Sequence, residues 1–287
     1  MGELLLQAAS PTVLNAAWKR LSKDKAEWLP GFPRWDMERD LVYHLTKLAE
    51  DLRNGTFRPA PVRQFPVAKA DGGHRVISAL SLRDKLAQRA VLMVLEPLGE
   101  ALFHHDSFGY RPGYTINMAL AKARQYVFCG LPWLVDADIR SFFDQIPHGP
   151  LRKVLKKIVP DKDVLRLIHQ WLETGTPRTG LLRARRGIPQ GAVLSPFLCN
   201  LYLNEFDWRL SGKNQSFVRF ADDFLIFTPD RRAAEAARNF AGQVLERMGL
   251  ALHPRKTRIV KSGPHVRFLG QKLPKPRVIG PPQTPAR

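Results

Sequence analysis

Two adjacent carboxylates, Asp222 and Asp223, interrupt an apolar stretch and constrain the fold more than any other feature. Residues 217–218 and 224–227 have the apolar pattern of two short strands, with residues 221–223 at the tip between them. Two negative charges side by side in a turn repel each other unless a cation offsets the repulsion. The pattern therefore indicates either an ordinary polar turn or a cation site at the tip of a hairpin.

A second acidic strand lies upstream, at residues 134–139 (LVDADI). Asp136 and Asp138 point to the same side of this strand because successive side chains alternate. Two strand ends that each carry aspartate can together hold a pair of Mg²⁺ ions, which prefer carboxylate oxygens as ligands. We therefore expect a site for two Mg²⁺ ions, with Mn²⁺ as an alternative metal.

The charge balance points to a polyanionic partner. The 287 residues include 45 Lys and Arg against 26 Asp and Glu, a net charge of +19 that favours nucleic acid. A membrane surface is the competing partner, but the chain has no apolar run of about 18 residues, so we expect no membrane contact. Cys129 and Cys199 have no metal-ligand spacing, which predicts reduced thiols and a cytoplasmic protein.

Hydrophobic periodicity and turn signals predict an α+β fold with an antiparallel sheet. A hairpin is expected at residues 65–78. The other strands are expected at residues 133–139, 217–218, 224–227, 257–261 and 265–270. The helices are expected at residues 12–21, 37–52, from Ser81 onward, 115–126, 150–158, 163–173, 195–209 and from Asp230 onward.

Several short motifs occur in an order and spacing that resemble those of reverse transcriptases, in particular the prokaryotic group II intron type. The central three are residues 138–144 (DIRSFFD), residues 187–196 (GIPQGAVLSP) and residues 220–223 (FADD). Residues 107–113 (SFGYRPG), 253–257 (HPRKT) and 268–270 (FLG) add to the resemblance. The motifs span about residues 60–270, and Phe220 stands where a tyrosine is more common.

The resemblance implies a right-hand polymerase architecture of fingers and palm, with an antiparallel palm sheet. Its expected domains are a basic helical N-terminal extension (1–60), fingers with the first part of the palm (61–132), a palm with the carboxylates (133–272) and a proline-rich tail (273–287). Few residues follow the FLG motif, so a thumb is expected to be largely absent.

The resemblance also assigns catalytic roles. Asp138, Asp222 and Asp223, together with the backbone carbonyl of Ile139, are the expected metal ligands. Lys256 matches a proposed general acid that protonates the leaving pyrophosphate. Asp136 lies on the same side as Asp138, but the family pattern favours Asp138.

Further residues match the nucleotide and primer contacts of the family. Phe143, five residues after Asp138, matches a steric gate that excludes the ribose 2′-hydroxyl and so favours deoxynucleotides. Ser141 and Phe142 are expected to offer backbone groups to the triphosphate. The remaining nucleotide contacts are expected from Lys69, Arg75, Gln190 and Gly191, and the primer grip from Phe268, Leu269 and Gly270.

These features predict an RNA-directed DNA polymerase that extends a DNA or RNA primer with dNTPs on an RNA template. The alternatives are a maturase-like RNA-binding protein and a template-independent defence polymerase of the same fold. A free-standing bacterial enzyme, CRISPR-associated or otherwise linked to antiviral defence, is expected rather than a truncated intron relic. A partner protein that supplies a thumb or an integrase function would fit such an enzyme.

Overall fold

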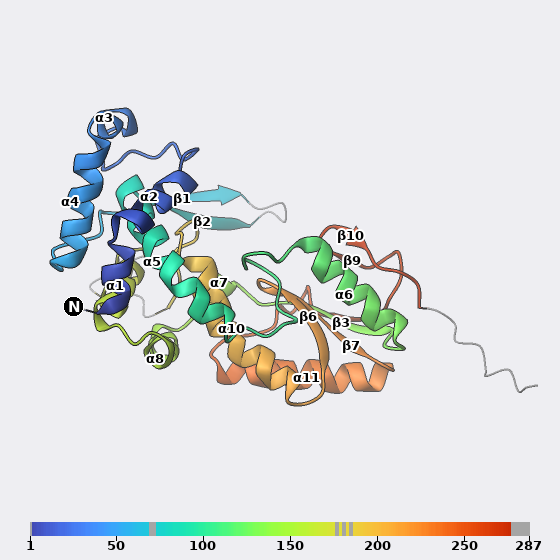
Figure 1. Cartoon of the computed structure of the whole chain (residues 1–287). Coiled ribbons are helices and arrows are strands. Elements are labelled where there is room, and N and C mark those ends of the chain that lie inside the picture. The colour runs from blue at the N-terminus through green and yellow to red at the C-terminus, as the bar shows by residue number, and fades with distance from the viewer. Residues whose placement is uncertain (1, 69–72, 176–177, 180–181, 184–185, 277–287) are drawn as a thin grey trace, which may run out of the picture. The chain divides into compact units, whose positions relative to one another are not determined.

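The computed structural model describes residues 2–68, 73–175, 178–179, 182–183 and 186–276. It divides into two compact units, each built from two stretches of chain (Figure 1). Unit 1 contains residues 1–103 and 143–202, and unit 2 contains residues 104–142 and 203–287. The predicted domain boundaries remain predictions, because they mark functional subdomains whereas the units mark where the chain packs on itself.

Unit 1 is mainly helical. Its N-terminal half holds α1 (Glu3–Ala8), α2 (Pro11–Arg20), α3 (Arg34–Arg39), α4 (Leu41–Arg53) and α5 (Leu82–Glu100). Its second stretch adds α8 (His148–Ile158), α9 (Lys162–Gly175), two short strands, β4 (Arg178–Thr179) and β5 (Leu182–Arg183), and the start of α10 (Ser195–Ser211). The side chains of Leu82, Leu86 and Val91 on α5 are fully buried, so this helix lies at the centre of the unit.

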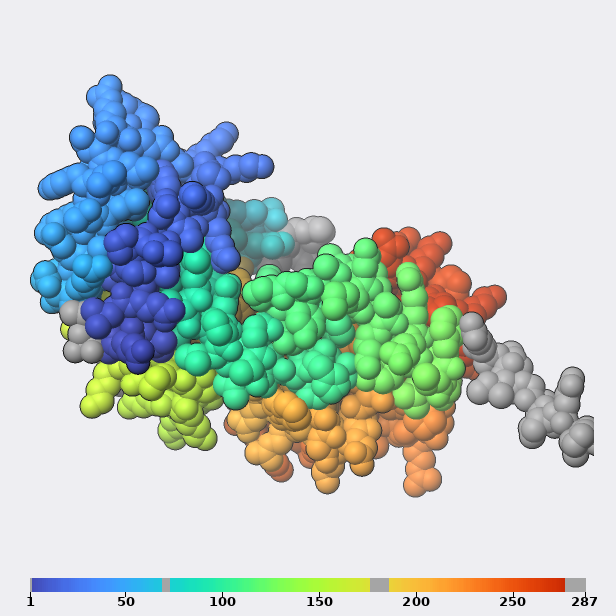
Figure 2. Space-filling model, in the orientation of Figure 1, coloured from blue at the N-terminus to red at the C-terminus, as the bar shows by residue number. Residues whose placement is uncertain are grey.

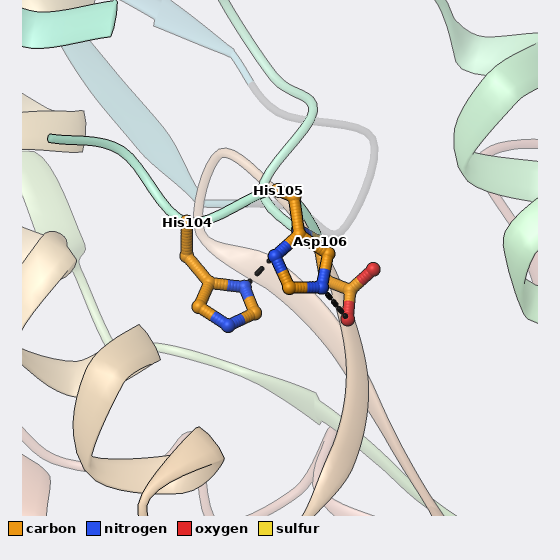
Figure 3. A group of neighbouring side chains, drawn as sticks. All are labelled: His104, His105 and Asp106. Carbon is orange, nitrogen blue, oxygen red and sulfur yellow. Dashed lines mark hydrogen bonds and ion pairs between the residues drawn. The ribbon is translucent and has the colours of Figure 1, made fainter. Parts of the chain in front are cut away.

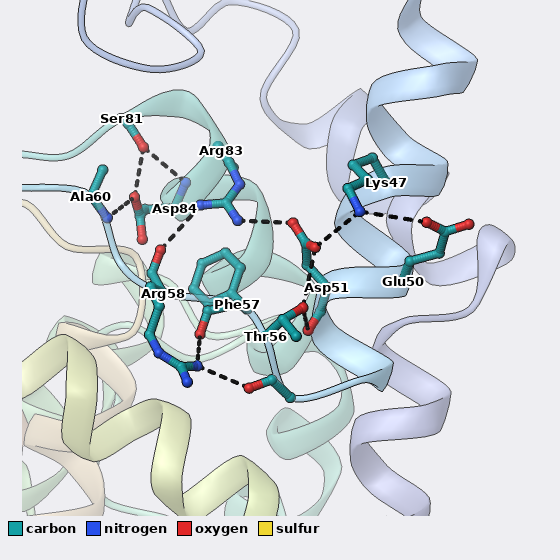
Figure 4. Close-up of polar contacts among 11 residues, drawn as sticks. Lys47, Glu50, Asp51, Thr56, Phe57, Arg58, Ala60, Ser81, Arg83 and Asp84 are labelled. Atoms are coloured by element: carbon teal, nitrogen blue, oxygen red, sulfur yellow. Dashed lines mark hydrogen bonds and ion pairs between the residues drawn. The ribbon is translucent and has the colours of Figure 1, made fainter.

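Asp84 joins the start of α5 to other parts of unit 1, and Figure 4 shows its contacts with Ala60 and Ser81. Its carboxylate accepts hydrogen bonds from the backbone N–H of Ala60, the Ser81 hydroxyl and the indole N–H of Trp171 on α9. Ser81 also caps the helix, since its hydroxyl accepts the N–H of Asp84. Burial raises the pKa of Asp84, so the hydrogen bonds offset part of the cost of burying a carboxylate here.

The hairpin of unit 1 consists of β1 (Arg63–Ala68) and β2 (His74–Ala79), which pair antiparallel. All six β1 side chains are exposed, and only Ser78 of β2 is buried. The backbone N–H of Ser78 donates to the carbonyl of Gln190 at 2.7 Å, so the loop at residues 187–191 is attached to the base of the hairpin.

Unit 2 contains a four-stranded antiparallel sheet in the order β6 (Ser216–Phe220), β7 (Asp223–Thr228), β3 (Trp133–Asp138) and β8 (Arg258–Lys261). The helix α6 (Ile116–Phe128) lies on one side of the sheet and α11 (Arg231–Arg247) on the other (Figure 1). A short hairpin of β9 (Arg267–Phe268) and β10 (Gln271–Lys272) follows. In Figure 2, residues from the first stretch of this unit (104–142, teal to green) lie next to residues after 203, in orange.

The two faces of this sheet differ in what they bury. Alternation puts Leu134, Leu225 and Phe227 on the α6 side, where they join a core with Leu120 and Ala123. The same alternation puts Asp136 and Asp138 on this side, further along β3 and beyond the apolar part of the core. The sheet therefore carries its carboxylates on a partly covered end of an otherwise buried face.

The predicted elements agree with the structure except in two places. The helix expected at residues 37–52 is two helices, because the backbone of Asp40 leaves the helical region (φ −119°, ψ 42°) between α3 and α4. The strand expected at residues 265–270 is a tight turn at Leu269 and Gly270 between the two-residue strands β9 and β10. Both φ values there are positive, at 51° and 79°, which a continuous strand does not allow.

Candidate active site

The carboxylates of the two acidic motifs meet in unit 2. Asp138 ends β3 and Asp223 begins β7, and the antiparallel register places these two residues directly opposite each other. Opposed residues on one face have Cβ atoms about 4.5–5.5 Å apart, so their charges interact strongly. The separate acidic stretches of the sequence therefore form one group, as the sequence predicted.

Asp222 belongs to the two-residue turn that joins β6 to β7. Phe220 pairs with Asp223, which leaves Ala221 and Asp222 as the central residues of the turn. Ala221 has a φ of 61°, the positive value that a type II′ turn requires at its first central position. Such turns suit the right-handed twist of a hairpin, and here the turn carries a carboxylate at its second central position.

An open cavity of about 500 Å³ lies over these carboxylates, and cations line its other side. The Nζ of Lys256 donates to Oδ2 of Asp138 at 2.9 Å, and the Nε of Arg258 donates to Oδ2 of Asp136 at 2.8 Å. The complete lining is Asp136, Ala137, Asp138, Asp222, Asp223, Arg255, Lys256, Arg258 and Arg267.

The electrostatics of the group are those of crowded, half-buried carboxylates. Burial, followed by the negative charges of Asp136, Asp138 and Asp222, raises the pKa of Asp223 to about 7, while Lys256 opposes the shift. The pKa of Asp222 is also raised, first by burial and then by Asp138. Burial raises the pKa of Asp136, against the ion pair with Arg258. Asp222 and Asp223 are thus incompletely neutralised by the protein itself.

This donor set fits divalent cations. Mg²⁺ and Mn²⁺ prefer oxygen ligands, and Asp138, Asp222 and Asp223 offer carboxylates that border one solvent-accessible cavity. The raised pKa of Asp223 reflects burial and then repulsion from the neighbouring carboxylates, and a bound cation would relieve that repulsion. The backbone of Ile139, also expected as a ligand, forms a bridge with Leu252, and its side chain is buried.

Several expected nucleotide contacts lie together in unit 1. The Gln190 side chain donates from Nε2 to Oδ1 of Asp144 at 3.2 Å, and the backbone N–H of Ile188 donates to the carbonyl of Phe143 at 2.7 Å. Gly191 has a φ of 100°, and a Cβ there would lie 2.9 Å from the carbonyl oxygen of Ser78. Glycine is therefore required at this position by both backbone conformation and close approach.

The other expected nucleotide contacts are distributed over both units. Ser141 is exposed and has a φ of 45°, while the side chain of Phe142 is buried in the core. Phe143 is half-buried at α7 (Phe142–Gln145). Arg75 is exposed on β2, and Lys69 lies outside the described residues.

The expected primer grip is a tight hairpin. The side chain of Phe268 is 1% exposed and belongs to the hydrophobic core of unit 2. Leu269 and Gly270 form the turn, and Gly270 is exposed. A primer contact at this motif would therefore come from the turn residues rather than from the phenylalanine ring.

A second group of metal-binding side chains lies in the loop before α6, where His104, His105 and Asp106 have ligand atoms within 4.8 Å of one another (Figure 3). Burial lowers the pKa of His104 to about 4, so this imidazole is neutral near pH 7. However, its Nδ1 already accepts the N–H of Asp106. Lys122 Nζ lies 3.5 Å from Oδ1 of Asp106, and the Tyr126 hydroxyl donates to Oδ2 at 2.8 Å. These partners hold the loop and disfavour a metal ion.

Sequence reasoning identified Lys256 but missed two other cations beside the carboxylates and a buried one at the base of their turn. Arg258 and Arg267 line the cavity, and Arg219 is fully buried at the base of the turn that carries Asp222. A signal was present for Arg219, since an arginine between two apolar strand residues requires a buried partner. The identity of that partner, Asp207 on α10, follows only from the packing of the helix against the sheet.

In the part of the chain that the structure describes, no helix combines the length and the apolar character needed to cross a membrane.

Comparison with known proteins relates the whole central region to one family. Residues 67–273 match the family model described as "Reverse transcriptase (RNA-dependent DNA polymerase)". The Escherichia coli (strain K12) protein YkfC is 32% identical over 281 residues, which cover 83% of this chain and 73% of YkfC. The group II intron-encoded protein LtrA of Lactococcus lactis is 34% identical over 224 residues, but the match covers 77% of this chain and only 37% of LtrA.

Solved structures agree at the level of the fold. A telomerase structure from Candida tropicalis, in complex with a fragment of telomeric RNA, has a TM-score of 0.56 at 16% identity. The match covers 83% of this chain and 47% of that chain. The family match includes Asp138, Asp222, Asp223 and Lys256. This chain belongs to the reverse transcriptase family, of the prokaryotic group II-like type.

Proposed function

We propose that this chain is an RNA-directed DNA polymerase that extends a primer 3′-hydroxyl with deoxynucleotides. The observation that carries the proposal is the meeting of Asp138, Asp222 and Asp223 at one cavity within the region matched to the family. RNA binding alone does not require three crowded carboxylates, whose repulsion is a cost unless cations use them. A maturase-like RNA-binding role is therefore the weaker alternative.

Asp138, Asp222 and Asp223 are the proposed ligands of two Mg²⁺ ions, with Mn²⁺ as a substitute. Ions bound there would lower the pKa of the primer 3′-hydroxyl and neutralise charge on the triphosphate and the leaving pyrophosphate. Asp222 lies on a tight turn and Asp138 on a strand end, so neither carboxylate needs a large rearrangement to present its oxygens.

Lys256 is proposed to hold a proton for the leaving pyrophosphate. Its ammonium is half-exposed at the cavity and bonded to Asp138, which keeps the side chain over the carboxylates. Arg255 and Arg267 line the same cavity and would attract phosphate groups. The lining thus combines acidic groups for metal ions with basic groups for a polyphosphate.

Unit 1 is proposed to supply nucleotide contacts through Lys69, Arg75, Gln190, Gly191 and Phe143, with the backbone of Ser141 and Phe142 from the adjoining chain. The hydrogen bond from the backbone N–H of Ser78 on β2 to the carbonyl of Gln190 supports this role, because a nucleotide contact must be held in a fixed geometry. Phe143 is proposed as the gate against ribonucleotides, and the turn of Leu269 and Gly270 as the primer grip.

The proposed partners are an RNA template, a DNA or RNA primer, dNTPs and a protein that adds thumb or integrase function. The reaction is proposed to take place in the cytoplasm, where Cys129 and Cys199 would remain reduced; the structure has no disulfide among its described residues.

A primer-extension assay on a heteropolymeric RNA template tests the proposal. The expected result is a Mg²⁺-dependent DNA product complementary to the template, formed from dNTPs in preference to rNTPs. A homopolymer made without template or primer would favour a template-independent polymerase. Tight RNA binding without extension would favour the maturase-like role.

A further inference from the structure

The turn that carries Asp222 is strained. Ala221 has a φ of 61°, in the left-handed region that non-glycine residues rarely adopt. Glycine is the usual residue at the first central position of a type II′ turn, because a Cβ is unfavourable there. A strained residue persists only where its surroundings hold it in place.

The side chain of Arg219 binds the backbone of this turn. Its Nη1 donates to the carbonyl oxygen of Ala221 at 2.9 Å, across the base of the turn. The guanidinium is fully buried and also binds Asp207 of α10 through two hydrogen bonds, from Nε to Oδ1 at 2.7 Å and from Nη2 to Oδ2 at 2.6 Å. A planar fork bound on two edges cannot rotate away from the third acceptor.

The loop before α6 holds the same turn from the side. Arg219 donates its backbone N–H to the carbonyl of Asp106 and accepts the N–H of Phe108, at 2.9 and 2.8 Å. Gly109 lies so close to the turn that a Cβ there would be 2.3 Å from the backbone N of Ala221. The SFGYRPG motif therefore packs against the backbone of the catalytic turn.

We propose that Arg219, clamped by Asp207, is a positioning residue that keeps Ala221 left-handed and so aims the Asp222 carboxylate at the site of Asp138 and Asp223. The expected effect on primer extension rests on the proposed polymerase function, whereas the expected effect on metal binding does not. Arg219 does not line the cavity, so it acts through the turn and not on substrate.

The first test compares Arg219→Lys, which keeps the charge and loses the planar fork, with the unchanged chain. Mn²⁺ binding measured by electron paramagnetic resonance should weaken about tenfold, and the Mg²⁺ concentration for half-maximal extension should rise by a similar factor. The matched control is Arg34→Lys in unit 1, which also loses bonds from an arginine to backbone carbonyls. This control should leave Mn²⁺ affinity unchanged.

The decisive variant is the double change Arg219→Lys with Ala221→Gly. Glycine adopts a positive φ without strain, so it should recover most of the lost Mn²⁺ affinity if the role of Arg219 is to hold Ala221. A merely structural role of the ion pair would lower the melting temperature in both variants and give no recovery at the metal site.

Gly109→Ala provides a second route if Arg219→Lys fails to fold, because it disturbs the turn and leaves the ion pair intact. It should also weaken Mn²⁺ binding. Unchanged Mn²⁺ affinity in folded Arg219→Lys, absence of recovery by Ala221→Gly, or unchanged affinity in Gly109→Ala would each overturn the proposal. An unchanged chain that binds Mn²⁺ but never extends a primer would instead overturn the proposed function.

An independent observation concerns the charge on α8 and α9. Six cations follow one another on these helices: Arg152, Lys153, Lys156, Lys157, Lys162 and Arg166. Arg152 pairs with Glu173 and Arg166 with Asp163, but none of the four lysines lies within ion-pair distance of a carboxylate in the described residues. All four lysines are exposed.

The helices α8 and α9, which carry these exposed lysines, are anchored in the core of unit 1. Leu151 and Leu155 of α8 and Val164 and Ile168 of α9 are fully buried, so the two helices are anchored through their opposite sides. Figure 2 shows α8, in lime, at the surface below the N-terminal helices. By contrast, residues 1–60, expected to be basic, hold nine Lys and Arg against eight Asp and Glu.

We also infer that the four lysines of α8 and α9 bind the phosphate backbone of RNA. Unpaired ammonium groups at i, i+3 and i+4 on one helix face, as at Lys153, Lys156 and Lys157, match a row of phosphates better than an isolated acidic group. The inference concerns an RNA surface of unit 1 and does not depend on catalysis.

The test compares two variants with the same charge change. Lys153, Lys156 and Lys157 are changed to Gln in one, and the exposed Lys19, Lys23 and Lys25 in the other. Affinity for an RNA hairpin is measured by fluorescence anisotropy between about 50 and 200 mM salt, where phosphate contacts typically lose strength. The α8 variant should bind RNA about tenfold more weakly. The slope of its log binding constant against log salt concentration should be smaller in magnitude by about two. The variant of Lys19, Lys23 and Lys25 should keep nearly the RNA affinity of the unchanged chain.

Equal losses in the two variants would show a general charge effect and overturn the inference, as would an unchanged α8 variant. Polyglutamate that competes as well as RNA would assign the face to an acidic protein instead. Normal extension of a short primer–template by the α8 variant is expected, and it separates this surface from the catalytic proposal.

Discussion

Lys256 Nζ lies 2.9 Å from Oδ2 of Asp138, so one carboxylate of the candidate active site is bonded to a side-chain cation. Lys256 is half-exposed. Exposed ion pairs contribute about 0–1 kcal/mol to stability, because both charges are well solvated and the side chains lose freedom. We therefore expect Lys256 to affect the rate of the reaction more than the stability of the fold.

Lys256→Ala should leave the free energy of unfolding within about 1 kcal/mol of that of the unchanged chain, since the half-exposed Lys256 contributes little through its pair with Asp138. It should lower the maximal rate of primer extension by at least about tenfold, in the range of general acid catalysis. Chemical denaturation and single-turnover extension measure the two effects. Loss of stability with an unchanged rate would make Lys256 a structural residue and remove its assignment as general acid.

Phe143→Ala should raise incorporation of ribonucleotides relative to deoxynucleotides by about tenfold, because a smaller side chain no longer excludes the 2′-hydroxyl. The ratio of kcat/KM values for a matched rNTP and dNTP measures the change. Phe143→Tyr retains the ring and is the control that should keep the ratio. If the ratio is the same in all three proteins, the sugar is selected elsewhere.

The raised pKa of Asp223 predicts how stability depends on pH. The folded protein binds a proton at Asp223 up to about pH 7, whereas an unfolded chain releases it near the ordinary aspartate value of 3.8. The folded state therefore holds more protons between these values, and the contribution of this group to stability falls as pH rises towards 7. Mg²⁺ competes with the proton, so its stabilising effect should grow over the same range.

Thermal unfolding with and without Mg²⁺ between about pH 5 and pH 8 measures this prediction. The increase in melting temperature caused by Mg²⁺ should be larger at pH 8 than at pH 5, and Asp223→Asn should remove most of the difference. Glu235→Gln, which breaks a surface pair with Arg231, is the control that should not alter it. A pH-independent Mg²⁺ effect in the unchanged chain would contradict the shifted pKa of Asp223.

The central features of the fold followed from local patterns. The hairpin around Asp222 and Asp223 was predictable because two short apolar runs flank a turn, and the strand of Asp138 was predictable because apolar residues alternate with its two aspartates. The helix starts at Ser81, Thr115 and Asp230 were visible as capping residues.

Other features depend on contacts that a sequence does not display. The break at Asp40 divides a continuous helix-period pattern, so periodicity alone predicts one helix. The bond between Arg219 and Asp207 joins a strand to a preceding helix, and the pairing of Asp136 with Arg258 joins residues 122 positions apart. Local patterns identified the carboxylates and the family resemblance identified Lys256, but neither identified Arg219 or Arg258.

The most direct test of the account is primer extension by Asp222→Asn, a change that keeps the size of the side chain and removes its charge. Asp222 is expected to bind metal in the reaction and to contribute little to RNA binding. Most Mg²⁺-dependent extension should be lost, by at least about a hundredfold, as expected when a charged group that acts in the transition state is removed. RNA affinity and melting temperature should stay close to those of the unchanged chain. Full extension by a folded Asp222→Asn protein would contradict the assignment of the metal site.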